Sequence, residues 1–196
     1  MSRDDGKLHC TDVLAESGLV DYSFVNADVL ERKSDLGIAV HKACCLFDQN
    51  RKFSVDPEVD PYVDAWKEFR ERTRFVPRLI EQPHEAVVNG MSYTMRVDRE
   101  GLLAGEETIV ELKTCANAMR HHGVQLAGYA MGLPREKSSS PFGRFLLRRR
   151  IVVKLTRQGV AKVIRYDDNA DFGVFVSALY VATWKRKNAK EYTRKS

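Results

Sequence analysis

The sequence predicts one mixed α/β domain, in which a central mixed β-sheet is flanked by helices and preceded by a helical extension. Three observations support this. Apolar residues recur at helical spacing over residues 1–75, they alternate with polar residues in segments of 76–166, and helical spacing returns between and after those segments. The chain of 196 residues has the length of a single domain. We divide it into a helical N-terminal part (1–75), a core of sheet and helices (76–184) and a basic tail (185–196).

Four short helices are predicted in the N-terminal part. Ser, Thr, Asp and Asn are favourable first residues because their side chains accept hydrogen bonds from the free N–H groups of the first turn. Proline is tolerated in a first turn because its missing N–H is not needed there. The predicted starts are Thr11 or Asp12, Asn26 or Asp28, Ser34–Asp35, and Pro57 with Pro61.

The middle of the chain changes to the period of β-strands. Residues Val76 to Val88 are rich in strand formers and precede Asn89-Gly90, a strong signal for a hairpin turn. Residues Met91 to Arg99 alternate between apolar and polar, and a turn over Gly101–Gly105 leads to the strand Thr108–Lys113. These three strands are expected to form an antiparallel meander.

The last third alternates between helix and strand. Helical spacing returns at Met119 and ends at Gly132, where a Leu-Pro pair follows. Two strands are predicted near residues 145–155 and 160–166, and a last helix runs from an acidic cap at Asp167–Asp171 through Trp184.

Composition and charge exclude several classes of protein. Hydrophobic residues make up 43% of the chain, which is too many for a disordered protein. No run approaches the roughly 18 apolar residues of a membrane span, and the first residues do not form a secretory signal. We therefore expect a cytoplasmic protein without a membrane partner. Residues 135–196 carry 16 Lys and Arg against 5 Asp and Glu, which indicates a polyanion partner.

The four cysteines do not form a metal-binding motif. They are Cys10, the adjacent pair Cys44 and Cys45, and Cys115, and no C-x-x-C spacing occurs. Thiols of intracellular proteins are normally reduced. We expect free thiols and no iron–sulfur cluster.

Two acidic residues and a lysine of the meander are the candidates for chemistry. Glu111 and Lys113 lie two residues apart on one strand and point to the same face, and Asp98 comes beside Glu111 if the strands pair through the intervening turn. An acidic pair suits a hard cation such as Mg²⁺, with the Leu112 carbonyl as a third ligand and the lysine near a bound water. The alternative is an ion pair on a solvated sheet face.

Further motifs flank this set in a fixed order. They are G-x-x-x-H at Gly37–His41, an acid at Glu81 or alternatively Glu85, R-V-D at Arg96–Asp98, E-L-K-T at Glu111–Thr114, and Q-L-x-x-Y at Gln125–Tyr129. Together they resemble the PD-(D/E)XK nuclease superfamily, in its RecB-like or phage-type exonuclease branch. The motifs cover about half of the chain. Met95 departs from the family, where a glycine is often found, and Val97 takes the position of the proline.

The resemblance implies a restriction-endonuclease-like core and a Mg²⁺- or Mn²⁺-dependent DNA nuclease, more an exonuclease than a site-specific endonuclease. It implies a role in recombination, repair or phage DNA processing. The partners it implies are a recombination protein and further copies of the same chain in a homo-oligomer. The metal ligands it implies are His41, Glu81, Asp98, Glu111 and Leu112. The catalytic residues it implies are Asp98, Glu111, Lys113, Gln125 and Tyr129.

Basic residues late in the chain are candidates for binding DNA. They are Arg148, Arg150, Lys185, Arg186 and Lys187, and the alternative for all of them is a solvated surface. Two other functions remain as alternatives to the nuclease. One is a weakly active or inactive DNA-binding scaffold that keeps the nuclease fold. The other, an iron–sulfur nuclease, is disfavoured because no cysteine follows Cys115.

Overall fold

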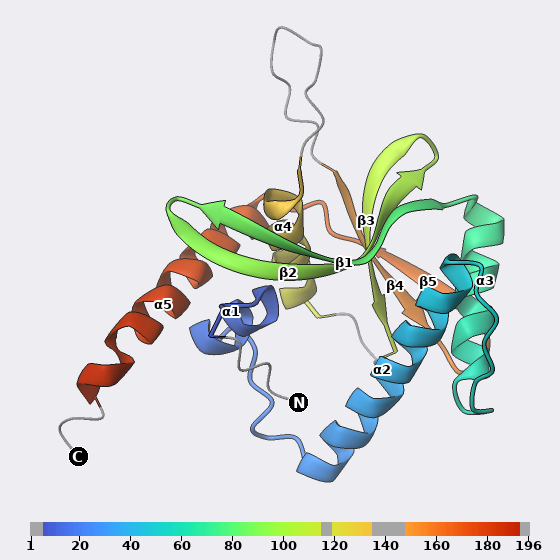
Figure 1. Cartoon of the computed structure of the whole chain (residues 1–196), viewed down its shortest axis with the longest axis horizontal. Coiled ribbons are helices and arrows are strands. Elements are labelled where there is room, and N and C mark those ends of the chain that lie inside the picture. Colours follow the sequence, from blue (N-terminus) through green and yellow to red (C-terminus); the bar gives the residue numbers. More distant parts are fainter. Residues whose placement is uncertain (1–5, 115–118, 135–147, 193–196) are drawn as a thin grey trace, which may run out of the picture.

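The computed structural model describes residues 6–114, 119–134 and 148–192, with side chains up to residue 189. Within these residues, five helices and a five-stranded mixed sheet form a layered α/β arrangement (Figure 1). The predicted loop 135–143, the start of the strand predicted from 145, Cys115 and the last four residues of the basic tail lie outside the described residues.

The sheet has its strands in the order β1-β2-β3-β4-β5. The strands are β1 (Val76–Val88), β2 (Met91–Leu103), β3 (Glu106–Lys113), β4 (Arg149–Leu155) and β5 (Ala161–Arg165). The first three form the predicted antiparallel meander, and β4 and β5 are also antiparallel. The pair β3 and β4 is parallel because the helix α4 (His121–Gly132) lies between them in the chain and provides the crossover.

Helices cover both faces of the sheet. The helices α1 (Cys10–Ser17), α4 and α5 (Ala170–Tyr192) pack together on one side, and α2 (Ala27–Asp48) and α3 (Asp60–Thr73) pack against the other. Residues of β3 alternate between the two hydrophobic cores, with Ile109 in the first and Val110 and Leu112 in the second. The sheet is therefore buried on both faces at its centre.

Helix α2 corrects one prediction. Two helices were expected, starting at Asn26 or Asp28 and at Ser34–Asp35, but one helix runs from Ala27 to Asp48. The Asn26 side chain caps it by accepting from the N–H groups of Asp28 and Val29. Ser34 and Asp35 are exposed within the helix, and no proline forces an end there.

Other boundaries also differ from the prediction. Strand β2 continues through Gly101 to Leu103, and the turn is Ala104–Gly105. Gly101 lies within the strand because β1 approaches it so closely that a Cβ atom would meet the Val76 carbonyl oxygen at 2.1 Å. Helix α4 begins at His121, two residues after Met119, and α5 continues beyond Trp184 into the basic segment.

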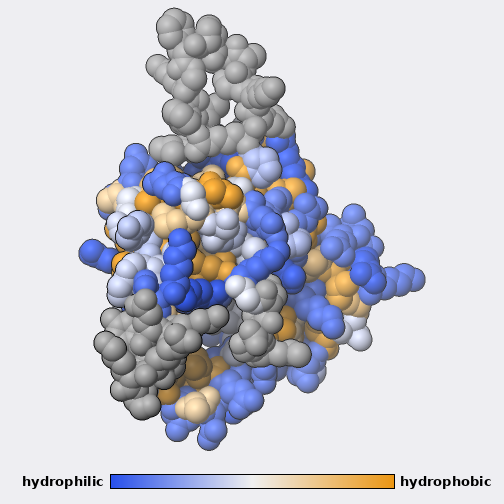
Figure 2. Space-filling model, turned by 60° about the vertical axis from the view of Figure 1, so that its left-hand side comes forward, coloured by the Kyte–Doolittle hydropathy of each residue, from blue (hydrophilic) through white to orange (hydrophobic). Residues whose placement is uncertain are grey.

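None of the helices in the described parts of the chain is both long and apolar enough to span a membrane. Hydrophilic residues cover much of the face seen in Figure 2, with hydrophobic residues in patches between them.

His122, in the first turn of α4, is held in its neutral form. The residue is 5% exposed, and its Nδ1 atom accepts a hydrogen bond of 3.2 Å from the backbone N–H of Met119. Burial, followed by the positive charge of Lys113, lowers the pKa of His122 to about 3. In the unfolded chain the same group has a pKa of about 6.5.

We expect His122 to make the folded protein less stable as the pH falls below about 6.5, because the unfolded chain then binds a proton that the folded chain does not. Replacing His122 with Asn keeps an acceptor but removes the titration. As the pH falls, the free energy of unfolding of the variant should decrease by up to about 1.4 kcal/mol less per pH unit than that of the parent. Urea unfolding of both proteins between about pH 5 and 7 measures this difference, and parallel profiles would contradict it.

Candidate metal centre

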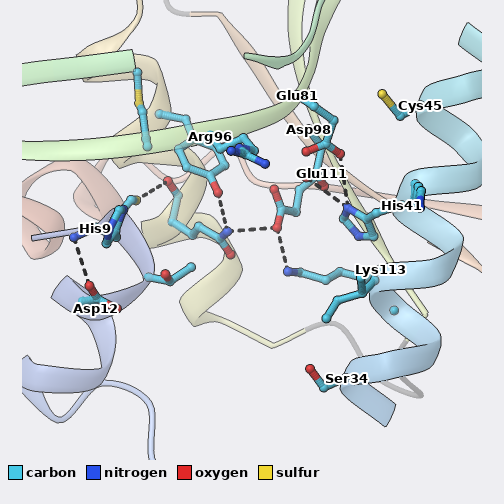
Figure 3. A pocket seen from close by; sticks show the side chains of 18 of the residues that line it. His9, Asp12, Ser34, His41, Cys45, Glu81, Arg96, Asp98, Glu111 and Lys113 are labelled. Atoms are coloured by element: carbon cyan, nitrogen blue, oxygen red, sulfur yellow. Dashed lines mark hydrogen bonds and ion pairs between the residues drawn. The ribbon is translucent and has the colours of Figure 1, made fainter. Parts of the chain in front are cut away.

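A cavity of about 1220 Å³ lies between α1, α2, the β1–β3 meander and α4. Most of the residues named by the motifs line it: His41, Glu81, Asp98, Glu111, Lys113, Gln125 and Tyr129. Figure 3 shows those that it labels, His41, Glu81, Asp98, Glu111 and Lys113, converging on one region from α2 and the strands. The fold therefore brings together residues that are up to 88 positions apart, from His41 to Tyr129.

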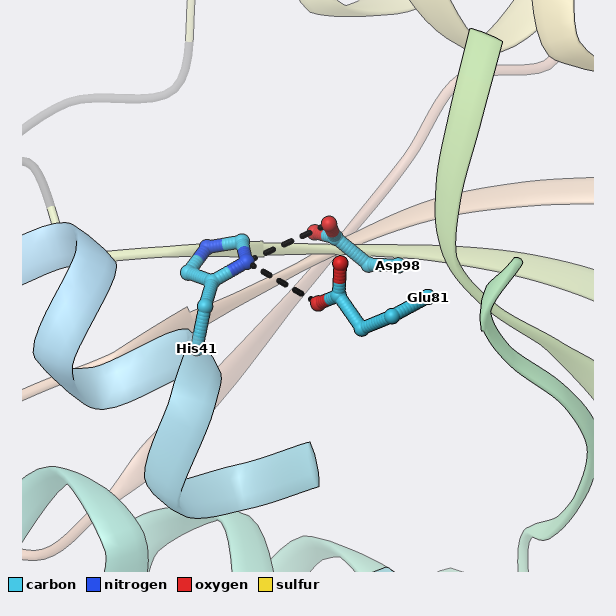
Figure 4. Close-up of side chains that lie close together, drawn as sticks. All are labelled: His41, Glu81 and Asp98. Carbon is cyan, nitrogen blue, oxygen red and sulfur yellow. Dashed lines mark ion pairs between the residues drawn. The ribbon is translucent and has the colours of Figure 1, made fainter. Parts of the chain in front are cut away.

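Three of these side chains form a compact cluster (Figure 4). His41, Glu81 and Asp98 each offer a ligand atom, and these atoms all lie within 4.8 Å of one another. His41 Nδ1 lies 3.2 Å from Asp98 Oδ1 and 3.5 Å from Glu81 Oε1. Helix α2 supplies the histidine, and β1 and β2 supply the two acids.

The strand register explains why the two acids meet. Ile80 pairs with Arg99 and Gln82 pairs with Val97, so Glu81 lies opposite Asp98. Glu85, the alternative to Glu81, pairs with Thr94 further along the hairpin and forms an ion pair with Lys7. The structure thus places Glu81 in the cluster and Glu85 outside it.

His41 links the carboxylates to the backbone of β3. Its Nε2 atom lies 3.1 Å from the Leu112 carbonyl oxygen, and Asp98 Oδ2 accepts a 2.7 Å hydrogen bond from the Leu112 N–H. Burial alone would lower the pKa of His41, but Asp98 outweighs it and raises the pKa to about 10. Burial would raise the pKa of Asp98, but His41 lowers it to about 2. When no cation occupies the site, the neighbouring acids therefore favour the protonated form of His41.

Glu111 is the second acidic group of the site. Val110 of β3 pairs with Arg99 of β2, so the next residue of β3, Glu111, lies opposite Asp98. Its Oε1 atom accepts hydrogen bonds from Lys113 Nζ at 2.6 Å and from Gln125 Nε2 at 2.9 Å. Its Oε2 atom is buried and has no hydrogen-bond partner among the described residues. Burial, followed by the negative charge of Asp98, raises the pKa of Glu111 to about 7.

Gln125 and Tyr129 lie one turn apart on α4 and act together. Gln125 Nε2 donates to the Tyr129 hydroxyl at 2.7 Å as well as to Glu111. Both residues are buried. Their part in the site is thus to fix the position of the Glu111 carboxylate.

The donor set fits a hard divalent cation. Carboxylate oxygens and a backbone carbonyl are the ligands that Mg²⁺ and Mn²⁺ prefer. The unpartnered Oε2 atom of Glu111 is a buried acceptor that a cation would satisfy, and burial of such an atom without a partner is costly. The candidate ligands are Asp98, Glu111 and the Leu112 carbonyl, with Glu81 and His41 beside them.

Two contributors were not assigned to the site from the sequence. Strand alternation places Arg99 on the opposite face of β2 from Asp98, yet the Arg99 guanidinium donates to Glu81 Oε1 at 3.3 Å. Asp48, at the end of α2, binds Arg99 at 2.5 Å and is buried. Its spacing of seven residues from His41 places both on one face of the helix, which is the signal that could have identified it.

Met95, the departure from the family pattern, belongs to the first hydrophobic core. It is 3% exposed. A Cβ atom on Gly132 of α4 would meet the Met95 methyl carbon at 2.6 Å, so the thioether fills the space that this glycine leaves. The bulky side chain is accommodated by close packing against α4.

The predicted DNA-binding residues are divided among different surroundings. Arg150 is buried and donates to the Asp171 carboxylate and to the carbonyls of Gly123 and Asp168. We therefore leave it out of the DNA-binding set, because its guanidinium is used within the fold. Arg148 has a side chain 9% exposed and lies near Glu107.

The basic segment of α5 also differs from the predicted tail. Lys185 and Arg186 lie on the helix and contact α1, since Lys185 donates to the Glu16 carbonyl and Arg186 pairs with the Glu16 and Asp12 carboxylates. Arg186 lines the main cavity, and Lys187 lines a smaller pocket of about 350 Å³ beside it.

Comparisons with known proteins assign no family. No family model and no curated protein matches the chain. A solved structure described as "Crystal structure of SSO0001" shows a weak likeness, with 16% sequence identity and a TM-score of 0.39. The match covers 63% of this chain and 56% of that chain.

Glu81 has a backbone conformation that is unusual for its residue type. Its φ angle is 52°, in the left-handed region where a Cβ atom is unfavourable. Such strain is tolerated where surrounding contacts fix the residue. Here the contacts are those of the carboxylate with His41 and Arg99.

We expect Glu81→Gly to be more stable than Glu81→Ala by about 1 kcal/mol, because both lose the carboxylate but only alanine keeps the Cβ atom. Gln82 is the matched control, since it pairs regularly with Val97 and glycine should there be less stable than alanine. Urea unfolding of the four variants measures both differences. Equal stability of the two variants at position 81 would contradict the strain.

Proposed function

We propose that the protein is a divalent-metal-dependent DNA nuclease that acts from DNA ends, and that its sheet is the core of the PD-(D/E)XK type. The observation that carries the proposal is the meeting of two facing acids with a lysine. Asp98 and Glu111 lie across β2 and β3 from each other, and Lys113 Nζ lies 2.6 Å from Glu111 Oε1. Hydrolysis of a phosphodiester needs charge compensation and an activated water, and this set offers both.

The proposed cofactor is Mg²⁺ or Mn²⁺, held by Asp98, Glu111 and the Leu112 carbonyl, with Glu81 and His41 completing the surroundings. When bound, such a cation supplies positive charge for the phosphate and lowers the pKa of a water. His41 already contacts the Leu112 carbonyl and Asp98, so it fixes two of the ligands relative to each other.

Lys113 is the proposed group that positions or deprotonates the attacking water. Its side chain is 25% exposed, so its nitrogen is reachable from the cavity while it binds Glu111. Gln125 and Tyr129 hold Glu111 from the α4 side. The lysine and the glutamine contact the same oxygen of Glu111 and leave the other oxygen available.

The proposed substrate is DNA, bound through its backbone. Basic side chains line the cavity from several elements: Lys7, Lys42, Arg51, Arg96, Lys113 and Arg186. Arg96 is exposed and lies two residues before Asp98 on β2, so it can meet a phosphate next to the one being cleaved. Contacts with phosphates carry no sequence information, which fits an enzyme that degrades DNA without a preferred site.

We expect the protein to degrade linear DNA in the presence of Mg²⁺ or Mn²⁺, and to leave covalently closed circular DNA intact. Lys113→Ala and Asp98→Ala should each lower the rate by about 100-fold or more, because each removes a group that acts in the transition state. End-labelled linear DNA and circular DNA, incubated with each protein with and without EDTA, give the measurement.

Three outcomes would count against parts of this proposal. Parent-like activity of Lys113→Ala would overturn the role of the lysine. Cleavage of circular DNA would show an endonuclease. Tight binding of DNA by the parent without any cleavage would instead support the DNA-binding scaffold. Exposed Lys162 on β5 provides the control, since Lys162→Gln removes a positive charge away from the residues that line the cavity.

We also expect Arg96→Gln and Lys187→Gln to weaken DNA binding most at low salt. Each should reduce the slope of log affinity against log salt concentration by about 0.7 to 0.9, which is the effect of one lost phosphate contact. Fluorescence anisotropy with labelled DNA and a metal-free buffer measures the slopes. An unchanged slope would assign that residue to the solvated surface, and Lys162→Gln should leave the slope unchanged.

A further inference from the structure

A buried network of charged groups lies directly behind Glu81. Arg99 is fully buried, and its guanidinium donates to Asp48 Oδ2 at 2.5 Å, to the Asp98 carbonyl at 2.5 Å and to Glu81 Oε1 at 3.3 Å. The proposed reaction does not use Arg99 or Asp48. A guanidinium in such a place is costly to bury unless it serves several acceptors at once.

Asp48 is in turn held by two donors besides Arg99. Trp66 Nε1 donates to both of its oxygens at 3.0 and 3.1 Å, and Arg70 donates to Oδ1 at 2.7 Å. The Arg99 guanidinium also lies 5.7 Å from the centre of the Trp66 ring. Asp48 and Trp66 belong to α2 and α3, so the position of Arg99 is fixed by the two helices that cover this face of the sheet.

We propose that Asp48 and Arg99 are positioning residues that set the metal affinity of the site by holding the Glu81 carboxylate toward His41 and Asp98. This inference rests on the metal site of the proposed function. Glu81 has a strained backbone, and such strain persists only where contacts such as the one with Arg99 fix the residue. Arg99 and His41 contact the same oxygen, Oε1, which leaves Oε2 of Glu81 for a cation.

Asp48 has a separate electrostatic task. An isolated guanidinium next to a ligand carboxylate would repel a divalent cation, because both are positive and the interior screens charges weakly. The Asp48 carboxylate accepts from Arg99 Nε, whereas Glu81 accepts from Nη1, so Asp48 offsets the charge of the same guanidinium that contacts Glu81. Arg99 can therefore orient Glu81 without making the site unfavourable for a cation.

The test is calorimetric titration of the whole chain with Mn²⁺ in the absence of DNA. Arg99→Lys keeps the charge but loses the forked geometry, and Asp48→Asn exposes the Arg99 charge. Each should weaken Mn²⁺ binding by about tenfold or more, as is usual for residues that support metal ligands. Arg72→Gln is the matched control, because Arg72 lies on the same helix, α3, but is exposed and pairs with Glu68 outside the Arg99–Asp48 network, and it should bind Mn²⁺ like the parent.

A double-mutant cycle separates positioning from a general loss of structure. In a Glu81→Ala background, Arg99→Lys should have a much smaller effect on Mn²⁺ affinity, since the carboxylate that Arg99 positions is gone. Asp48→Asn should still weaken Mn²⁺ binding there, because it uncovers the Arg99 charge. Full additivity of Arg99→Lys with Glu81→Ala would overturn the inference, and so would parent-like affinity of both single variants. Circular dichroism checks folding, and Asp48→Asn decides the matter if Arg99→Lys does not fold.

The same titration distinguishes this inference from the proposed function. Saturable Mn²⁺ binding that Arg99→Lys weakens, in a parent that does not cleave DNA, would uphold the inference and overturn the nuclease. Cleavage of DNA by the parent, with unchanged Mn²⁺ affinity in both variants, would do the opposite. A parent without saturable Mn²⁺ binding would overturn the inference.

Discussion

The structure depends on the balance of negative charge in one partly enclosed site. Glu81, Asp98 and Glu111 lie close together where water screens their repulsion only weakly, so the fold has to offset it with positive groups. His41 does so from α2 and Lys113 from β3. Helix α2, the meander and α4 therefore keep fixed positions, because a shift of any one would leave a buried charge without its partner.

The same balance gives the two facing acids, Asp98 and Glu111, different pKa values. Asp98 has a partner at each carboxylate oxygen, the histidine at one and a backbone N–H at the other, and its pKa falls to about 2. Glu111 keeps one oxygen without a partner, and its pKa rises to about 7. The two carboxylates differ in their surroundings. A bound cation would change the contacts of Glu111 more than those of Asp98, because Glu111 has an oxygen without a partner.

The sequence predicted the meander because it depends on local alternation, whereas the candidate site residues came from the ordered motifs of the family resemblance. Strand β1 has the predicted bounds, and the motif residues from His41 to Tyr129 line one cavity. The sequence did not predict that α2 is a single helix, because this depends on which of its polar residues face solvent. It also did not predict that Gly101 lies within a strand, because this depends on how closely β1 approaches β2. The role of Arg99 near Glu81 was missed because period-two alternation alone says nothing of how far a long side chain reaches.

The contact between α1 and α5 has a consequence for the order in which the molecule is assembled. The wall that α1 gives to the cavity is held by Lys185 and Arg186, which lie more than 160 residues later in the chain. During synthesis on the ribosome, the β1–β3 meander can pair as soon as its neighbouring strands emerge. The part of the support for α1 that α5 provides forms only after α5 is translated, so this wall of the acidic site is completed only once residue 186 has been made.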